Sequence, residues 1–168
     1  MTMSENRQID ELQAHKVFSG DLYNLAWELL DKGKERTELE DEEMLFASYG
    51  SAYHWHKLKG AIDEDRWKQS RPIAHDQLSR VNVELGNYEM ALYHASRALY
   101  WCEKSGIRDL WLAFAYERLA VANHHLGLIS ERDKYLKAAE EAAKGIIIEQ
   151  DRNYFMGELA KDPGYVGT

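Results

Sequence analysis

Two nine-residue segments, 78–86 and 119–127, carry the same pattern. They read LSRVNVELG and LAVANHHLG, so Leu, Asn, Leu and Gly recur at identical positions. Their closing glycines, Gly86 and Gly127, lie 41 residues apart. Each segment has helical periodicity, and a second helical pattern follows it within two or three residues. A helix pair that repeats at about this length is typical of an α-solenoid, in which stacked pairs bury a continuous core.

The rest of the chain predicts an all-α fold of about seven helices in a single domain over residues 1–168. Ala, Leu, Glu and Lys are frequent and favour helix, and no run of alternating β-branched residues predicts a strand. The helices are expected over 7–31, 37–60, 72–86, 86–106 and 109–127, then from residue 130, and finally over 149–161.

Two places in this pattern are irregular. The first helix is expected to be interrupted near Ser19 and Gly20. The main part of the third helix is expected to begin at Pro72, because proline disfavours helical geometry at the residue before it and suits a first helical turn. A kinked or separate helical piece is expected in the segment 61–71 before it.

The second helix has a recognisable start. Thr37 begins the sequence TELE, a capping-box pattern in which Glu40 reaches back to the cap. The acidic run 38–43 then lies in the first turn, where negative charge meets the positive end of the helix dipole. We interpret the run as a solvated helix start, with a functional acidic patch as the alternative.

The segment GNYEMALYHASRAL, residues 86–99, resembles the second half of a tetratricopeptide repeat. Gly and Tyr stand at the turn, and the small residues Ala91 and Ala98 stand where neighbouring helices approach closely. The segment 126–142 is similar: Ala139 matches, but Arg132 replaces a small residue of the family. The phrases SAYHW and LAFAYERLA also resemble a branch of bacterial proteins, to which we attach no activity.

This resemblance implies a right-handed α-solenoid of antiparallel helix hairpins (TPR-like). Its repeats would cover 72–105 and 109–146, with a degenerate first hairpin over 7–60 and a C-terminal capping helix over 149–161. The first unit departs from the family, because 53 residues separate Gly33 from Gly86 and the usual repeat has about 34.

Composition and charge exclude several classes of partner. The net charge is −8 and no basic block is present, so we expect neither nucleic acid nor an anionic membrane surface as a partner. The chain has no apolar run long enough to span a bilayer, no signal-peptide pattern at its start and a single cysteine, Cys102. We therefore expect a cytoplasmic protein without an internal disulfide, with Cys102 in the core.

No motif announces a reaction. The chain has no GxSxG elbow, no glycine-rich phosphate loop, no HExxH and no cysteine pair. His54 and His56 are two residues apart and point in different directions on a helix, while His124 and His125 are adjacent. We expect no catalytic residues, no cofactor and no metal, with a metal site assembled between helices as the alternative.

In the tetratricopeptide-repeat family the first helix of each hairpin lines a concave groove that takes proteins or peptides. The resemblance therefore implies a partner-binding groove in this chain. Its expected residues are Tyr23 and Trp27; Asp76, Arg80 and Glu84; and Glu117, Val121 and His124, with His125 at the edge. Helical spacing places Glu117, Val121 and His124 on one face.

Several interpretations of these residues are open. Either the groove is a site for a protein or peptide bound through charge-assisted hydrogen bonds and stacking, or Arg80 and Glu117 pair across the helices and hold the repeats in register. The alternative function is a small-molecule sensor or enzyme, with a pocket lined by Tyr23, Trp27, Glu117 and His124.

The segment GIIIEQDRNYF near the C-terminus is apolar. It supplies three consecutive isoleucines, 146–148, followed by Tyr154 and Phe155. The end of a repeat array exposes apolar surface that needs a cap. We expect this segment to cap the array within the chain, and packing against a second copy would make a homodimer.

Overall fold

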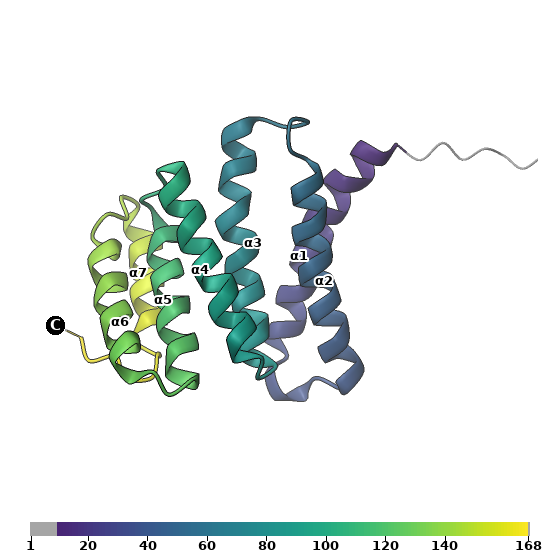
Figure 1. Cartoon of the computed structure of the whole chain (residues 1–168). Coiled ribbons are helices and arrows are strands. Elements are labelled where there is room, and N and C mark those ends of the chain that lie inside the picture. The colour runs from purple at the N-terminus through teal and green to yellow at the C-terminus, as the bar shows by residue number, and fades with distance from the viewer. Residues whose placement is uncertain (1–9, 168) are drawn as a thin grey trace, which may run out of the picture.

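The computed structural model describes residues 10–167 and contains seven α-helices there (Figure 1). They are α1 (Glu11–Asp31), α2 (Glu38–Lys57), α3 (Glu64–Glu84), α4 (Tyr88–Ser105), α5 (Leu110–His125), α6 (Ile129–Ala143) and α7 (Glu149–Leu159), with a short 3₁₀ turn, η1 (Gly33–Glu35), before α2. Residues 10–167 contain no strand. The expected all-α fold with about seven helices is therefore confirmed. Within the same residues, no helix combines the length and the apolar character needed to cross a membrane.

Neighbouring helices pack in pairs, α1 on α2, α3 on α4 and α5 on α6. Figure 1 shows α1 and α2 at one end, α5, α6 and α7 at the other, and α3 and α4 between them. The odd-numbered helices α1, α3, α5 and α7 also contact one another in series. This shared layer, which we call the inner layer, brings together side chains that lie far apart in the sequence.

The two glycine-ended segments form the same local structure. The side-chain amide of Asn82 donates to the carbonyl oxygen four residues earlier at 2.8 Å, and Asn123 does so at 2.7 Å. Gly86 and Gly127 then have φ values of 76° and 74°. In both cases the residue after the glycine donates its backbone N–H to the carbonyl of the asparagine. Such left-handed ends satisfy the last carbonyls of a helix, so the sequence pattern marks two equivalent helix ends.

Small residues lie where helices approach closely. Ala91, Ala98 and Ala139 are at most 1% exposed, so these positions leave no room for a larger side chain without rearrangement. Cys102 is also fully buried, as expected, and burial raises the pKa of its thiol to about 12.

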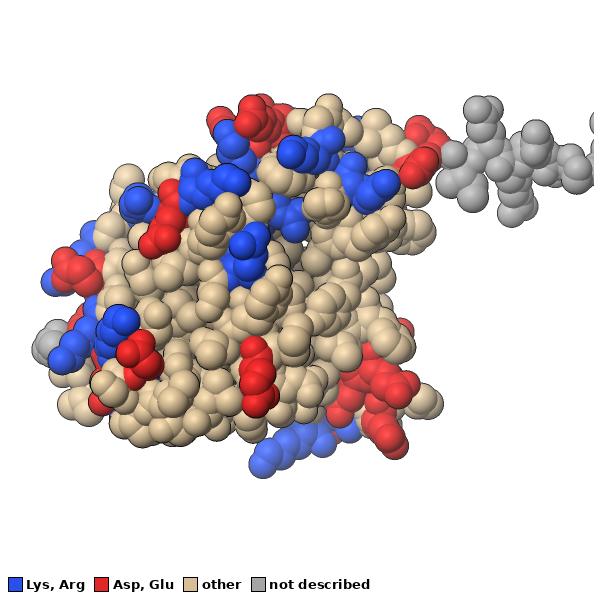
Figure 2. Space-filling model, viewed as in Figure 1, with Lys and Arg blue, Asp and Glu red and all other residues tan. Residues whose placement is uncertain are grey.

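The start of α2 confirms the capping box. Thr37 Oγ1 accepts the backbone N–H of Glu40 at 3.3 Å, and Glu40 Oε2 accepts that of Thr37 at 2.8 Å. Figure 2 shows acidic side chains grouped at the lower right of this face, where α2 begins. Their place at the first turn agrees with a helix start that is stabilised by the dipole.

The expected interruption of the first helix is wrong. α1 is continuous from Glu11 to Asp31, and the residues from 7 to 9 lie outside the described chain. Ser19 is buried, and its hydroxyl donates to the carbonyl oxygen of Lys16 at 3.0 Å. Its own carbonyl also accepts the hydroxyl of Ser51 from α2 at 2.7 Å. The bond from Ser51 fixes α1 to α2 next to Gly20, where the helix continues without a break.

The helical piece expected before Pro72 is present, but the expected helix boundary at Pro72 is wrong, because α3 runs from Glu64 through Pro72 to Glu84. A proline inside a helix costs about 3 kcal/mol. The residues before it offset this loss. Asp63 caps the helix by accepting the N–H of Arg66 at 3.0 Å, and Trp67 is buried against Trp101 with ring centroids 5.7 Å apart. Burial of one tryptophan is worth about 3–5 kcal/mol.

The C-terminal helix covers one end of the core. Ile146, Phe155 and Leu159 are at most 2% exposed and belong to the cluster formed with α5 and α6. Ile147 is 94% exposed and Ile148 61% exposed. The segment therefore buries part of its apolar surface within the chain, and its role in a homodimer stays a prediction.

The left-handed glycines give a first stability test. In Gly127→Ala the added Cβ meets no atom within 4 Å, so the effect isolates the backbone strain at φ 74°. We expect a loss of about 1–2 kcal/mol in the free energy of unfolding, measured by urea denaturation. Gly157→Ala is the control: its Cβ also enters open space, but this glycine lies inside α7, so we expect a gain of about 0.5–1 kcal/mol. Equal effects at the two sites would contradict this account.

Candidate functional site

The predicted groove residues all lie on the inner layer. Tyr23 and Trp27 belong to α1, Asp76, Arg80 and Glu84 to α3, and Glu117, Val121 and His124 to α5. Most of these side chains are half-buried, and Glu84 is exposed. Asp76 and Glu117 differ, because they are only 3% and 1% exposed. The two carboxylates are therefore part of the interior.

A buried arginine binds both of these carboxylates. Arg118 Nε donates to Asp76 Oδ1 at 2.8 Å, and its Nη1 donates to Glu117 Oε2 at 2.6 Å. Asp162, just after α7, lies beside Glu117 and Arg118. The cluster joins α3, α5 and the C-terminal segment, and an arginine fork suits such paired recognition of carboxylates.

Burial dominates the protonation of this cluster. It raises the pKa of Glu117 above its ordinary value, although Arg118 acts in the opposite direction. Burial also raises the pKa of Asp162. Glu117 and Asp162 lie close together, and the one nearby arginine, Arg118, also binds Asp76. Because three carboxyl groups face a single positive charge, Glu117 and Asp162 retain a proton more easily than they would in water.

The alternative in which Arg80 and Glu117 pair across the helices is wrong. Among the described residues, no hydrogen bond or ion pair joins these two side chains, and Glu117 is bound by Arg118. Arg118 escaped the sequence analysis because it directly follows Glu117 in a mostly apolar helix. The repeat offset could have revealed it. Arg118 stands 41 residues after Gln77, whose side-chain amide reaches back to the carbonyl of Tyr23 on α1 at 2.8 Å.

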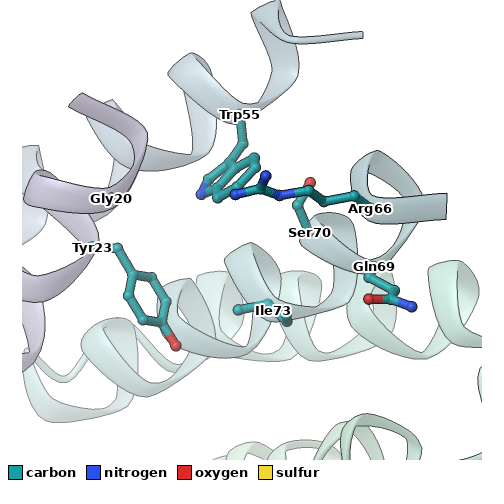
Figure 3. Close-up of a pocket in the computed structure, with 7 residues that line it drawn as sticks. All are labelled: Gly20, Tyr23, Trp55, Arg66, Gln69, Ser70 and Ile73. Atoms are coloured by element: carbon teal, nitrogen blue, oxygen red, sulfur yellow. The ribbon is translucent and has the colours of Figure 1, made fainter. Parts of the chain in front are cut away.

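A pocket opens between α1, α2 and α3, with a volume of about 210 Å³. It is lined by Gly20 and Tyr23 from α1, Trp55 from α2, and Arg66, Gln69, Ser70 and Ile73 from α3. Figure 3 shows the rings of Tyr23 and Trp55 on different sides of the pocket, with Ile73 below Trp55 and to the right of Tyr23. Most of the lining is apolar, so the pocket suits an apolar group.

One cation stands at this pocket. The guanidinium carbon of Arg66 lies 5.9 Å from the centroid of the Trp55 ring, and Figure 3 shows the two groups facing each other. Arg66 forms no ion pair with a carboxylate of residues 10–167. Burial raises the pKa of Tyr23 to about 12, so its hydroxyl is neutral at physiological pH. The pocket therefore offers aromatic walls and one available positive charge.

Only part of this pocket is predictable from the sequence. Tyr23 was a predicted site residue, but Trp27, Glu117 and His124 do not line the pocket. Trp55 stands in the aromatic phrase YHWH and Arg66 in the ambiguous segment before Pro72. Because the lining comes from three helices, no single periodic pattern contains it.

The histidines form contacts with one another and with aromatic rings. His15 and His54 are joined through their Nδ1 atoms at 2.7 Å, and His75 and His94 at 3.0 Å. His125 stacks on a tyrosine ring. Within residues 10–167, no group of three or more His, Cys, Asp or Glu is arranged to hold a metal ion.

The pH dependence of stability tests the raised pKa of Glu117. As pH rises from about 4.5, the unfolded chain releases this proton before the folded chain does, so the free energy of unfolding falls. Glu117→Gln cannot titrate and should lack this fall. We expect the wild type to lose up to about 1.4 kcal/mol per pH unit relative to the variant, measured by urea denaturation from pH 5 to 8.

Asp21→Asn removes an exposed carboxylate and is the control for the general effect of charge. Its stability should follow the wild type at every pH. Parallel curves for the wild type and Glu117→Gln would refute the assignment of a retained proton to this cluster.

Comparison with known proteins gives no family assignment. No protein-family model, no curated protein and no solved structure matches the chain. The resemblance to tetratricopeptide repeats therefore stays a prediction that rests on the residues themselves.

Proposed function

We propose that this chain is a non-catalytic helical-repeat scaffold that binds a protein or peptide in its concave groove, with an anchoring pocket between α1, α2 and α3. The proposal includes a right-handed solenoid of antiparallel helix hairpins, as in tetratricopeptide repeats. The matching helix ends at Gly86 and Gly127 support it, as do the buried alanines at the close approaches.

The pocket between α1, α2 and α3 is the observation that carries the binding proposal. Pockets that enclose drug-sized ligands have roughly 300–1,000 Å³, so a volume of about 210 Å³ suits a single aromatic or long aliphatic side chain better. Tyr23 and Trp55 provide flat apolar walls for such a side chain. The size of this pocket therefore suits one inserted side chain of a protein segment.

Arg66 defines the second feature of the partner. Its guanidinium is exposed beside Trp55 and lacks an ion-paired carboxylate among the described residues. A carboxylate near the inserted side chain would receive charge-assisted hydrogen bonds from it. The proposed recognition element is an apolar or aromatic residue followed or preceded closely by Asp or Glu.

Gly20 allows a test that leaves the rest of the pocket unchanged. A Cβ added at Gly20 meets no atom within 4 Å, and this glycine lines the pocket inside α1. Gly20→Leu should fill the pocket, and Gly20→Ala should leave most of it open. Both replacements favour helix by up to about 1 kcal/mol, so neither is expected to unfold the chain.

A peptide library would be selected on the wild-type chain, and the affinities of the selected peptides would be compared by calorimetry. We expect Gly20→Leu to weaken binding at least about tenfold and Gly20→Ala to change it less than about twofold. Arg66→Gln should weaken peptides that carry Asp or Glu and reduce the salt dependence of their binding. Peptides that bind Gly20→Leu as well as the wild type would exclude this pocket.

A further inference from the structure

A second cluster of side chains lies on the opposite side of α3, where it meets α4. The guanidinium carbon of Arg71 is 5.4 Å from the ring centroid of Trp67 and 6.0 Å from that of Trp101. The two indole rings meet edge to face at 5.7 Å. Arg71 is thus held between two tryptophans from different helices, with 6% of its surface exposed.

Three further cations lie around these two tryptophan rings and the neighbouring ring of Tyr100. Arg97 lies 4.4 Å from the ring centroid of Tyr100 and 5.9 Å from that of Trp101. Lys104 lies 5.0 Å from the Trp101 centroid, and Lys59 lies 5.3 Å from that of Trp67. Figure 2 shows Lys and Arg side chains gathered over the upper part of the face, where α3 begins and α4 ends. In a chain of net charge −8, this concentration is unexpected.

None of these four cations forms an ion pair with a carboxylate in residues 10–167. Arg71 Nη1 is buried and has no hydrogen-bond partner in the described chain. Burial lowers the pKa of Arg71, and Arg97 lowers it further. The pKa of His75 falls to about 3, mainly through burial, with His94, Arg71 and Arg97 acting in the same direction. Every charged neighbour that acts on Arg71 or His75 here is basic.

Two other arginines with buried side chains, Arg36 and Arg118, each bind two carboxylates. Arg118 binds Asp76 and Glu117. Arg36, whose side chain is 5% exposed, binds Asp41 at 2.7 Å and Glu84 at 2.8 Å. A buried charge without a partner is strongly unfavourable, so proteins normally pair it. Arg71 is the exception, and stacking between two indoles compensates it only in part.

We propose that Arg71 and Arg97 form a binding site for a phosphate group. Two guanidinium groups match a phosphate monoester, which carries about −1.5 to −2 charges at neutral pH, whereas a carboxylate would neutralise only one of them. Their planar forks suit bidentate contact with phosphate oxygens. The exposed Lys104 and Lys59 add attraction at the rim, and Tyr100 and Trp101 offer aromatic surface to the body of the ligand.

Access to the site lies on the α4 side. Arg97 and Trp101 are half-buried and Tyr100 is exposed, so the proposed site requires these side chains to rotate and admit the ligand to Arg71 Nη1. Such rotations occur within nanoseconds. The site is separate from the pocket of Tyr23 and Trp55, which is lined from α1, α2 and α3, and it does not depend on the proposed peptide binding.

The test is a titration of the full chain with inorganic phosphate at pH 7 and constant ionic strength, followed by NMR of the histidine ring signals. Bound phosphate places negative charge near His75, so we expect saturable shifts and a higher pKa for this imidazole. Arg71→Met should lower the affinity at least about tenfold, because it removes charged hydrogen bonds. Acetate at the same concentration should bind more weakly than phosphate.

Lys68→Gln is the matched control, because it removes one positive charge from the same helix at a residue paired with Glu64. It should change the affinity for phosphate less than about twofold at physiological salt, where exposed charges are screened. Urea denaturation checks the fold: without phosphate, Arg71→Met should be at least as stable as the wild type, since the buried charge is gone. Arg97→Gln gives a second, more exposed variant that should also weaken binding.

Two further ligands distinguish whether the site takes the phosphate group of a ligand with an aromatic body or that of a phosphorylated side chain. Tighter binding of adenosine monophosphate than of phosphoserine would support the site and assign it to ligands with an aromatic body. The reverse order would support it and assign it to phosphorylated side chains. The absence of a saturable response in the wild type would overturn the proposal, as would equal phosphate affinity in the wild type and both arginine variants.

Discussion

The packing of the inner layer depends on the ion pairs that the buried guanidinium of Arg118 forms with two carboxylates. This guanidinium holds Asp76 of α3 and Glu117 of α5, and Asp162 of the C-terminal segment lies beside them. Removing one partner from such a cluster leaves an uncompensated charge in the interior. The same contact takes two carboxylates away from the inner surface. These two carboxylates are therefore not available to a partner, whereas Arg66 of α3, beside Trp55 of α2, is exposed.

Local signals predicted the helix ends well. The capping box at Thr37 and the glycines at 86 and 127 act through contacts within a few residues, which a sequence displays directly. The start of α3 was missed because the packing of Trp67 against Trp101 outweighs the local effect of Pro72. The pocket was missed because its walls come from three helices. The role of Arg118 depends on a partner in the preceding repeat, which periodicity along one helix does not reveal.

The net charge of the sequence does not reveal how charge is distributed over the surface of the folded protein. The sequence contains no contiguous basic block, and its acidic balance was used to exclude polyanionic partners. The fold nevertheless assembles Lys59, Arg71, Arg97 and Lys104 around three aromatic rings. These residues are separated by up to 45 positions in the sequence. Helical packing can therefore concentrate one sign of charge locally in a chain whose total has the other sign.

The early start of α3 has a consequence for the two proposed binding sites. α3 has 21 residues, whereas α5, which takes the corresponding place in the next helix pair, has 16. The five added residues, 64–68, include Arg66, which lines the pocket, and Trp67, which packs against Arg71 in the second cluster. One short helical extension therefore supplies a side chain to each of the two proposed sites, so a change in its length would alter both sites together.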